Sequence, residues 1–398
     1  MMYIEFKFIP KTFFFLIAIL ILLEPPIFVV SNEMANIDKI YDYLKVACSL
    51  PVFFWFVINN SFFKKVVNIV FLISGIWVVQ VLSSIYYDGN IKNAVSSYMC
   101  VMAICMIVYS MAIDNYDTVL NCIAGYLTVL ALLNLITQIM FPMGLLQIIS
   151  IWEDEIGLWI LGGVNTTVSF ALPATILQCI RYERSHKLMC IVWAAISSST
   201  IIIADSATGL VGLVVFLSMF FIRKILKLES VSRVFNINTY VIISAIIIIM
   251  FLLIGNFSIF EKIIVDILGR DMTLTTRTEI WDKVKDEIVQ NWIFGHGIPV
   301  LDEFRRAYGA SHLHDYYLQL LYQGGVVTLL AFCWLLNICR KKLYLNRKSD
   351  IAHTLSAGIF GFLIMFISEV YDTQYLLPFY ILLMLSLSYS PTKQIEGE

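Results

Sequence analysis

Apolar residues dominate the chain in long runs that are separated by short polar loops. The runs do not alternate between apolar and polar positions as the strands of a membrane barrel do. A helix that spans a bilayer needs about 20 apolar residues. Backbone polar groups have no water partner in hydrocarbon, so these runs must be helical. We expect spans at residues 12–30, 43–59, 66–86, 94–113, 118–141, 164–180, 188–203, 209–222, 239–256, 326–339, 352–368 and 377–390. The pattern predicts an all-α polytopic membrane protein with about twelve transmembrane helices.

Composition supports a membrane protein and gives no sign of nucleic-acid binding. The sequence is 60% hydrophobic and 14% charged, whereas soluble domains carry about 25% charged residues. The net charge of -2 comes with basic residues scattered over short loops. No small-residue cleavage site follows the first apolar run, so we expect an uncleaved first helix rather than a signal peptide.

Lysine and arginine are concentrated in alternate loops, which predicts the orientation because such loops stay in the cytoplasm. The richer set is Lys7, Lys11, Lys64, Lys65, Arg181, Arg184, Lys187, Arg223, Lys224, Lys227, Arg233, Arg340, Lys341, Lys342, Arg347, Lys348 and Lys393, and the short loops on the other side hold Lys39, Lys45 and Lys92. Both termini are therefore expected in the cytoplasm, and the long polar stretch 257–325 outside it.

This stretch divides the chain into three expected parts. Residues 1–256 form the first nine spans, 257–325 an extracytoplasmic catalytic loop with short helices, and 326–398 the last three spans with a cytoplasmic tail. Within the loop, Ile280, Trp281 and Val284 share one face of an expected helix. Gly295 and Gly297 flank a histidine and permit a tight turn.

The loop also gathers the residue types that suit transfer of a group from a pyrophosphate. Arginine clamps phosphate through two parallel charged hydrogen bonds, and histidine can accept a proton near neutral pH. The candidates are Arg270, Arg277, Arg305, Arg306, His312 and His314. Together they fit a phosphate clamp with a general base. Binding of lipid headgroups or pairing with local acids is the plainer interpretation, and it stays open at this point.

Two metal sites can be considered from the sequence. His312, His314 and Asp315 are potential ligands, but three ligands within four residues are sterically awkward. The acidic run Glu153-Asp154-Glu155 could also hold a divalent ion. We expect neither a metal nor an organic cofactor.

Four short motifs in this stretch resemble the O-antigen polymerase and ligase superfamily, which includes the Wzy-type polymerases of O-antigen and capsule. The motifs are Thr276-Arg277-Thr278-Glu279-Ile280-Trp281, Gly295-His296-Gly297, Leu313-His314-Asp315-Tyr316-Tyr317-Leu318 and Gly324-Gly325-Val326. Their order, spacing and place in a long outer loop agree with the family over about 50 residues. Elsewhere only the number of spans and weak patterns such as Leu161-Gly162-Gly163-Val164-Asn165 agree.

The resemblance implies a GT-C-like membrane glycosyltransferase of the bacterial plasma membrane. His314 then takes the place of the family's catalytic histidine and Arg277 that of its phosphate-binding arginine. Arg270, Arg305, Arg306, His312, Asp315 and Tyr316 are candidates for binding pyrophosphate and sugar, and Gly295 and Gly297 for shaping the loop. The implied partners are undecaprenyl-pyrophosphate-linked donor and acceptor glycans, membrane lipid, a chain-length regulator and a flippase.

Two departures from the family pattern matter. Asp315 stands where the family has asparagine, and we expect its charge to raise the pKa of His314. Ligases often carry a basic residue in the loop that here reads Asp205-Ser206-Ala207-Thr208-Gly209. Because this loop has none, a second clamp is expected from Arg270, Arg305 or Arg306, and polymerase is favoured over ligase.

Three other functions remain as alternatives. A ligase would transfer finished polymer to a lipid A core, and a flippase or secondary transporter is compatible with twelve spans. Transporters keep ionisable groups at the midplane of the membrane, whereas here they gather in one loop. A purely structural role has no positive support in the sequence.

Overall fold

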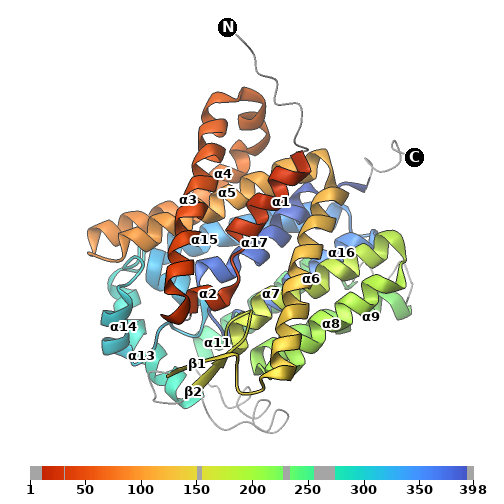
Figure 1. The fold of residues 1–398 in the computed structure, drawn as a ribbon. Helices are drawn as coiled ribbons and strands as arrows, with labels where there is room; N and C mark the ends of the chain where they lie inside the picture. The colour runs from red at the N-terminus through yellow and green to blue at the C-terminus, as the bar shows by residue number, and fades with distance from the viewer. Residues whose placement is uncertain (1–10, 31, 150–154, 227–233, 255–273, 392–398) are drawn as a thin grey trace.

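The fold is an assembly of helices with one short β-hairpin. The computed structural model describes residues 11–30, 32–149, 155–226, 234–254 and 274–391 (Figure 1). The helices are α1 (Lys11–Leu22), α2 (Pro26–Val30), α3 (Ala35–Ile58), α4 (Asn60–Tyr86), α5 (Ile91–Asp114), α6 (Tyr116–Met140), α7 (Val164–Ser185), α8 (Leu188–Ala204), α9 (Ala207–Leu226), α11 (Ile237–Ile254), α13 (Leu274–Gln290), α14 (Leu301–Tyr308), α15 (Tyr316–Leu345), α16 (Asp350–Met365) and α17 (Thr373–Ser388), with a 3₁₀ turn at Asn32–Met34. Strands β1 (Leu146–Ile149) and β2 (Glu155–Leu158) pair antiparallel.

The apolar runs are helical, which confirms the predicted all-α polytopic membrane architecture. Seven described helices are long and apolar enough to cross a membrane, and four further apolar helices are shorter. Each of the twelve predicted spans overlaps a described helix, and α7 covers the run predicted at 164–180. The first predicted span falls on α1 and α2, which are separated at Leu23–Pro25.

Asparagine side chains mark several helix starts. Asn59, Asn90 and Asn115 each accept a hydrogen bond from the backbone N–H three residues later, at the starts of α4, α5 and α6. Such caps satisfy one of the donors that a helix start leaves unpaired. Each asparagine also ends the preceding helix or loop, so consecutive helices are separated by very short connections.

The loops gather at two ends of the assembly, as the charge pattern predicts. The loops rich in lysine and arginine are tied together by ion pairs between Lys65 and Asp114, Arg184 and Asp117, Lys224 and Glu183, and Arg223 and Asp350. The loops expected outside are joined to one another by the bonds Asn90 to Ile298, Arg277 to Ser368 and Asn165 to Glu369. The assignment of the first end to the cytoplasm stays a prediction.

Lys45 differs from the sequence expectation. It does not lie in a loop but inside α3, where it is buried and its Nζ is 2.5 Å from Oε2 of Glu24. Desolvation makes an unpaired buried charge costly, so each of these two residues requires the other. The pair braces the break between α1 and α2 against α3.

Helix α17 forms the centre of the assembly, and the loop before it lies in the middle of the end that we expect outside the cytoplasm. Its side chains are almost all buried, and it packs against α5, α7, α15 and α16 (Figure 1). The loop 366–372 joins α16 to α17. Because α17 is central, this loop lies where α13, α7 and the turn between α8 and α9 can all reach it, as the bonds below show.

The last part of the chain begins earlier than the apolar pattern suggests. We predicted a span from residue 326, whereas α15 starts at Tyr316 and bends at Gly324 and Gly325, where the backbone leaves helical geometry. The side chain of Asp315 accepts a hydrogen bond from the N–H of Leu318 at 2.9 Å and so caps the earlier start.

Figure 1 shows α13 and α14 together with the hairpin near the lower edge of the view.

Candidate active site

Helix α13 carries Arg277 and is fixed to the loop before α15. Ile280, Trp281 and Val284 are buried, which is the face expected from their spacing. The indole Nε1 of Trp281 donates to the backbone oxygen of Leu313 at 2.5 Å. Arg277 lies one helical turn before Trp281 and therefore on the same face. Its Nη1 donates to the backbone oxygen of Ser368 at 2.6 Å, so α13 also holds the loop between α16 and α17.

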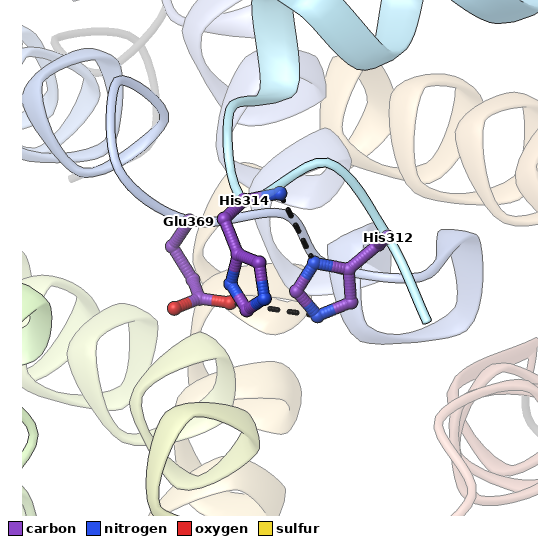
Figure 2. A group of neighbouring side chains, drawn as sticks. All are labelled: His312, His314 and Glu369. Carbon is purple, nitrogen blue, oxygen red and sulfur yellow. Dashed lines mark hydrogen bonds and ion pairs between the residues drawn. The ribbon is translucent and has the colours of Figure 1, made fainter. Parts of the chain in front are cut away.

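The two histidines lie side by side in the segment between α14 and α15. The ring centres of His312 and His314 are 4.2 Å apart (Figure 2). The backbone N–H of His314 donates to Nδ1 of His312 at 3.2 Å. Because that nitrogen accepts a hydrogen bond, the neutral His312 ring carries its proton on Nε2. Nδ1 of His314 is buried and has no hydrogen-bond partner among the described residues.

His314 holds its position with an unfavourable backbone conformation. Its φ is 54°, in the left-handed region that residues with a Cβ rarely adopt. The cost for an L-residue is roughly 1–2 kcal/mol. Such conformations concentrate at functional sites because the surrounding structure enforces them.

Glu369 completes the group from the loop before α17. Its carboxylate is buried, and Oε1 is 3.9 Å from Nε2 of His312 (Figure 2). Nδ2 of Asn165 donates to Oε2 at 2.6 Å, and Oγ of Ser206 donates to Oδ1 of Asn165 at 2.7 Å. The start of α7 and the turn between α8 and α9 thus hold the carboxylate in place.

Burial sets the charge state of this cluster. Burial raises the pKa of Glu369 to about 7, although the nearby charge of Arg277 acts to lower it. It lowers the pKa of His312 to about 4, with the Arg277 charge as a second cause. The pKa of His314 is lowered further, by burial first and then by His312 and Arg277. Both imidazoles are therefore neutral near pH 7.

The expected effect of Asp315 on His314 is wrong. The pKa of His314 is lowered rather than raised, and Asp315 is not among the causes. Its carboxylate is buried and bonded to the first turn of α15, where burial raises its pKa to about 7. Asp315 therefore acts as a helix cap in this structure.

The other predicted binding residues are not brought to the cluster. Arg305 and Arg306 are exposed on α14, and Nη1 of Arg305 lies 4.0 Å from a carboxylate oxygen of Asp302. Tyr316 is buried, with its ring 4.6 Å from the ring of Phe366 between centres, which is a core position. Arg270 lies outside the described residues. No contact joins Arg305, Arg306 or Tyr316 to the histidines within the part of the chain that the structure describes.

Gly295 and Gly297, between α13 and α14, have conformations and surroundings that exclude a side chain. Gly295 has a φ of 67° and Gly297 a φ of 81°. A Cβ would lie 2.5 Å from the backbone oxygen of Tyr322 at the first position and 2.4 Å from the backbone nitrogen of Ser84 at the second. Glycine is the residue that tolerates both the left-handed backbone and such close approach.

The same group of side chains could be considered for a cation. Ligand atoms of His312, His314 and Glu369 lie within 4.8 Å of one another. Atoms that share a zinc ion lie about 2.0–2.2 Å from it, so this set is wide. Arg277 interacts electrostatically with all three side chains and would repel a cation. Glu153 and Asp154, the other predicted metal candidates, lie outside the described residues, as does the side chain of Glu155.

Sequence reasoning missed the residues that hold the cluster together. Glu369 is one of many acidic residues in the sequence, and nothing in its neighbours distinguishes it. Asn165 stood in a pattern that only weakly resembled the family, and Ser206 in a loop noted for lacking a basic residue. The glycine-rich lead into α7 is the one signal that could have pointed to Asn165.

Comparison with known proteins gives one finding. Residues 192–333 match the family model Wzy_C, described as O-antigen ligase. The matched range holds Arg277, His312 and His314, whereas Asn165 and Glu369 lie outside it on either side. No curated protein matches the sequence.

Proposed function

We propose, on the premise that the chain belongs to the O-antigen polymerase and ligase superfamily, that it polymerises lipid-linked oligosaccharide repeat units. Members of this family are glycosyltransferase-like membrane enzymes of O-antigen-related polysaccharide synthesis. The observation that carries the proposal is the convergence of Arg277, His312, His314 and Glu369 from three separate segments at one end of the helical assembly.

The proposed reaction transfers a growing glycan from undecaprenyl pyrophosphate to a sugar hydroxyl of an incoming repeat unit. The bond between the anomeric carbon and the pyrophosphate oxygen breaks, and the hydroxyl oxygen forms the new bond to that carbon from the opposite face. The hydroxyl proton passes to His314, and the pyrophosphate leaves with the bond's electron pair. Arg277 stabilises the charge that grows on the leaving group.

His314 suits the role of base because it is neutral and its Nδ1 is unpartnered among the described residues. Its lowered pKa makes it a weak base before substrate binds. Pyrophosphate bound at Arg277 would offset the positive charge that contributes to this lowering, and so would raise the pKa of the ring. Glu369 beside His312 can then compensate for the proton that the histidine pair receives.

A polymerase is favoured over a ligase by the turn between α8 and α9. The ligase pattern places a basic residue there, whereas Ser206 and Thr208 bond to Asn165 and Ser368 with neutral hydroxyls. We place the reaction at the extracytoplasmic face of the bacterial plasma membrane, with both termini in the cytoplasm, without a metal or cofactor, and with a chain-length regulator and a flippase as partners.

The test is reconstitution of the purified protein in lipid nanodiscs with the lipid-pyrophosphate-linked repeat unit. The proposal expects a ladder of products that stay on lipid pyrophosphate, and loss of the ladder in Arg277→Ala. Product found only on added lipid A core would indicate a ligase. Movement of the substrate across the membrane of proteoliposomes without any new glycosidic bond would indicate a flippase, and either result would overturn the proposal.

A further inference from the structure

A cavity of about 240 Å³ opens at the outer end of the molecule, apart from the histidine cluster. Its walls come from the turn between α4 and α5, the end of α13, the Gly295–Gly297 turn, α14 and the start of α15. Arg277 and Glu287, the α13 residue that lines the cavity, are ten positions apart, which is about 15 Å along a helix. The cavity is therefore not the place where the proposed bond forms.

Aromatic rings form most of one wall. The rings of His296 and Tyr322 are stacked, with centres 5.2 Å apart and an angle of 19° between their planes. Phe304 lies 5.7 Å from Tyr322 and 4.6 Å from Tyr308, and Tyr87 lies 5.2 Å from His296. These rings are held in place before any ligand binds, since each rests on its neighbours.

The backbone beneath the rings is equally fixed. The N–H of Ile298 donates to Oγ of Ser84 at 2.8 Å, and the N–H of Asn90 donates to the oxygen of Ile298 at 2.7 Å. Gly297 packs so closely on Ser84 that no side chain fits. The two glycines therefore position His296 in the lining of this cavity. The histidine cluster does not require that position.

Carboxylates supply the polar part of the lining, through Asp88, Glu287 and Glu303. The hydroxyl of Tyr308 is buried beside the carboxylate of Glu287 and the hydroxyl of Tyr322, and it makes no well-formed hydrogen bond with either. A buried hydroxyl whose hydrogen bonds are poorly formed is destabilising. A ligand hydroxyl at this point would satisfy it.

We propose that this cavity is a carbohydrate subsite that binds neutral or amino sugars of the glycan. Ring faces carry negative charge and attract the polarised C–H groups of a sugar, while carboxylates and a phenol bond its hydroxyls. Among the residues that the structure describes, the lining has three carboxylates and no lysine or arginine, so it repels the pyrophosphate and acidic sugars. This inference rests on the proposed function, which identifies the ligand as a glycan. It assigns the cavity to the part of that glycan that lies remote from the reacting bond.

The test measures binding to the full-length protein in nanodiscs by calorimetry with two separate probes. One is the oligosaccharide repeat unit freed by mild acid from the host's lipid-linked intermediate, and the other is inorganic pyrophosphate. Tyr308→Phe keeps the ring and removes the hydroxyl, and Glu287→Gln keeps the shape and removes the charge. Asp286→Asn is the matched control, because its exposed side chain is adjacent in sequence and does not line the cavity.

We expect Tyr308→Phe and Glu287→Gln each to weaken oligosaccharide binding roughly three- to tenfold, the effect of one lost hydrogen bond, while Asp286→Asn binds as the unaltered protein does. Equal affinity in Tyr308→Phe and the unaltered protein, with both equally stable, would overturn the subsite. Arg277→Ala separates the two proposals, since it should weaken pyrophosphate binding and leave oligosaccharide binding unchanged. If pyrophosphate bound Arg277→Ala undiminished, the clamp would fail and the subsite would stand.

Discussion

Replacing His314 by glycine separates the role of its side chain from that of its backbone. The residue has a φ of 54°, and an L-residue in this region is destabilised by roughly 1–2 kcal/mol relative to glycine. Glycine loses more chain entropy on folding, which offsets about 0.5–1 kcal/mol of that gain. We therefore expect His314→Gly to be as stable as the unaltered protein or slightly more so. Loss of a general base should lower the transfer rate about 10²- to 10⁴-fold.

His186 provides a matched control for this substitution. It has a φ of 52°, ends α7 and lies at the opposite end of the molecule. His186→Gly relieves the same backbone conformation and should leave transfer unchanged.

The assay combines thermal unfolding in nanodiscs with the rate of ladder formation from the lipid-linked repeat unit. Transfer by His314→Gly at more than a tenth of the normal rate would show that the ring is not the base. A large fall in its unfolding temperature would show that ring contacts, rather than function, hold the backbone at this position.

Three further predictions concern the groups around the histidines. Arg277→Lys keeps the charge and loses the planar fork, so we expect the KM for the lipid-linked donor to rise about tenfold or more with a smaller effect on kcat; an unchanged KM would contradict bidentate clamping. Glu369 has its pKa raised to about 7 from 4.5, so transfer should increase as pH rises through about 7 and the carboxylate ionises. The same shift means that the folded protein binds this proton more tightly than the unfolded chain does. The protonated carboxyl's contribution to the free energy of unfolding is therefore lost as the pH rises from about 4.5 to about 7. Glu369→Gln should remove both pH dependences, and a normal pH profile in this variant would show that another group titrates. Asn165→Ala removes a 2.6 Å hydrogen bond to the buried carboxylate of Glu369. A hydrogen bond to a charged group contributes about 1.5–3 kcal/mol, so its loss should slow transfer roughly 10- to 100-fold. Asn165→Asp places a second acid beside Glu369 and should not restore the transfer rate.

The helical architecture could be predicted because it depends on local sequence. A run of apolar residues must be helical in hydrocarbon whatever its neighbours are, so the predicted spans coincide with described helices. The buried face of α13 followed in the same way from the spacing of Ile280, Trp281 and Val284. Placing Arg277 and His314 near each other required the family resemblance, since 37 positions separate them in the sequence.

The surroundings of the histidines could not be predicted, because they depend on packing between distant segments. Glu369 comes to His312 only because α17 is central and the loop before it is bonded to Arg277 of α13. Tyr316 belonged to a motif and was expected at the site, yet helix α15 turns its ring toward Phe366. Asp315 was interpreted as a charge beside a base, although an aspartate before an apolar helix is also a common cap.

The most direct measurement of the central claim is the polysaccharide profile of cells that lack this protein and carry a variant of it. With the unaltered protein we expect long polymer. With His314→Ala or Arg277→Ala, present in the membrane at the normal level, we expect single repeat units on lipid pyrophosphate and no ladder. A normal ladder from either variant would contradict the account.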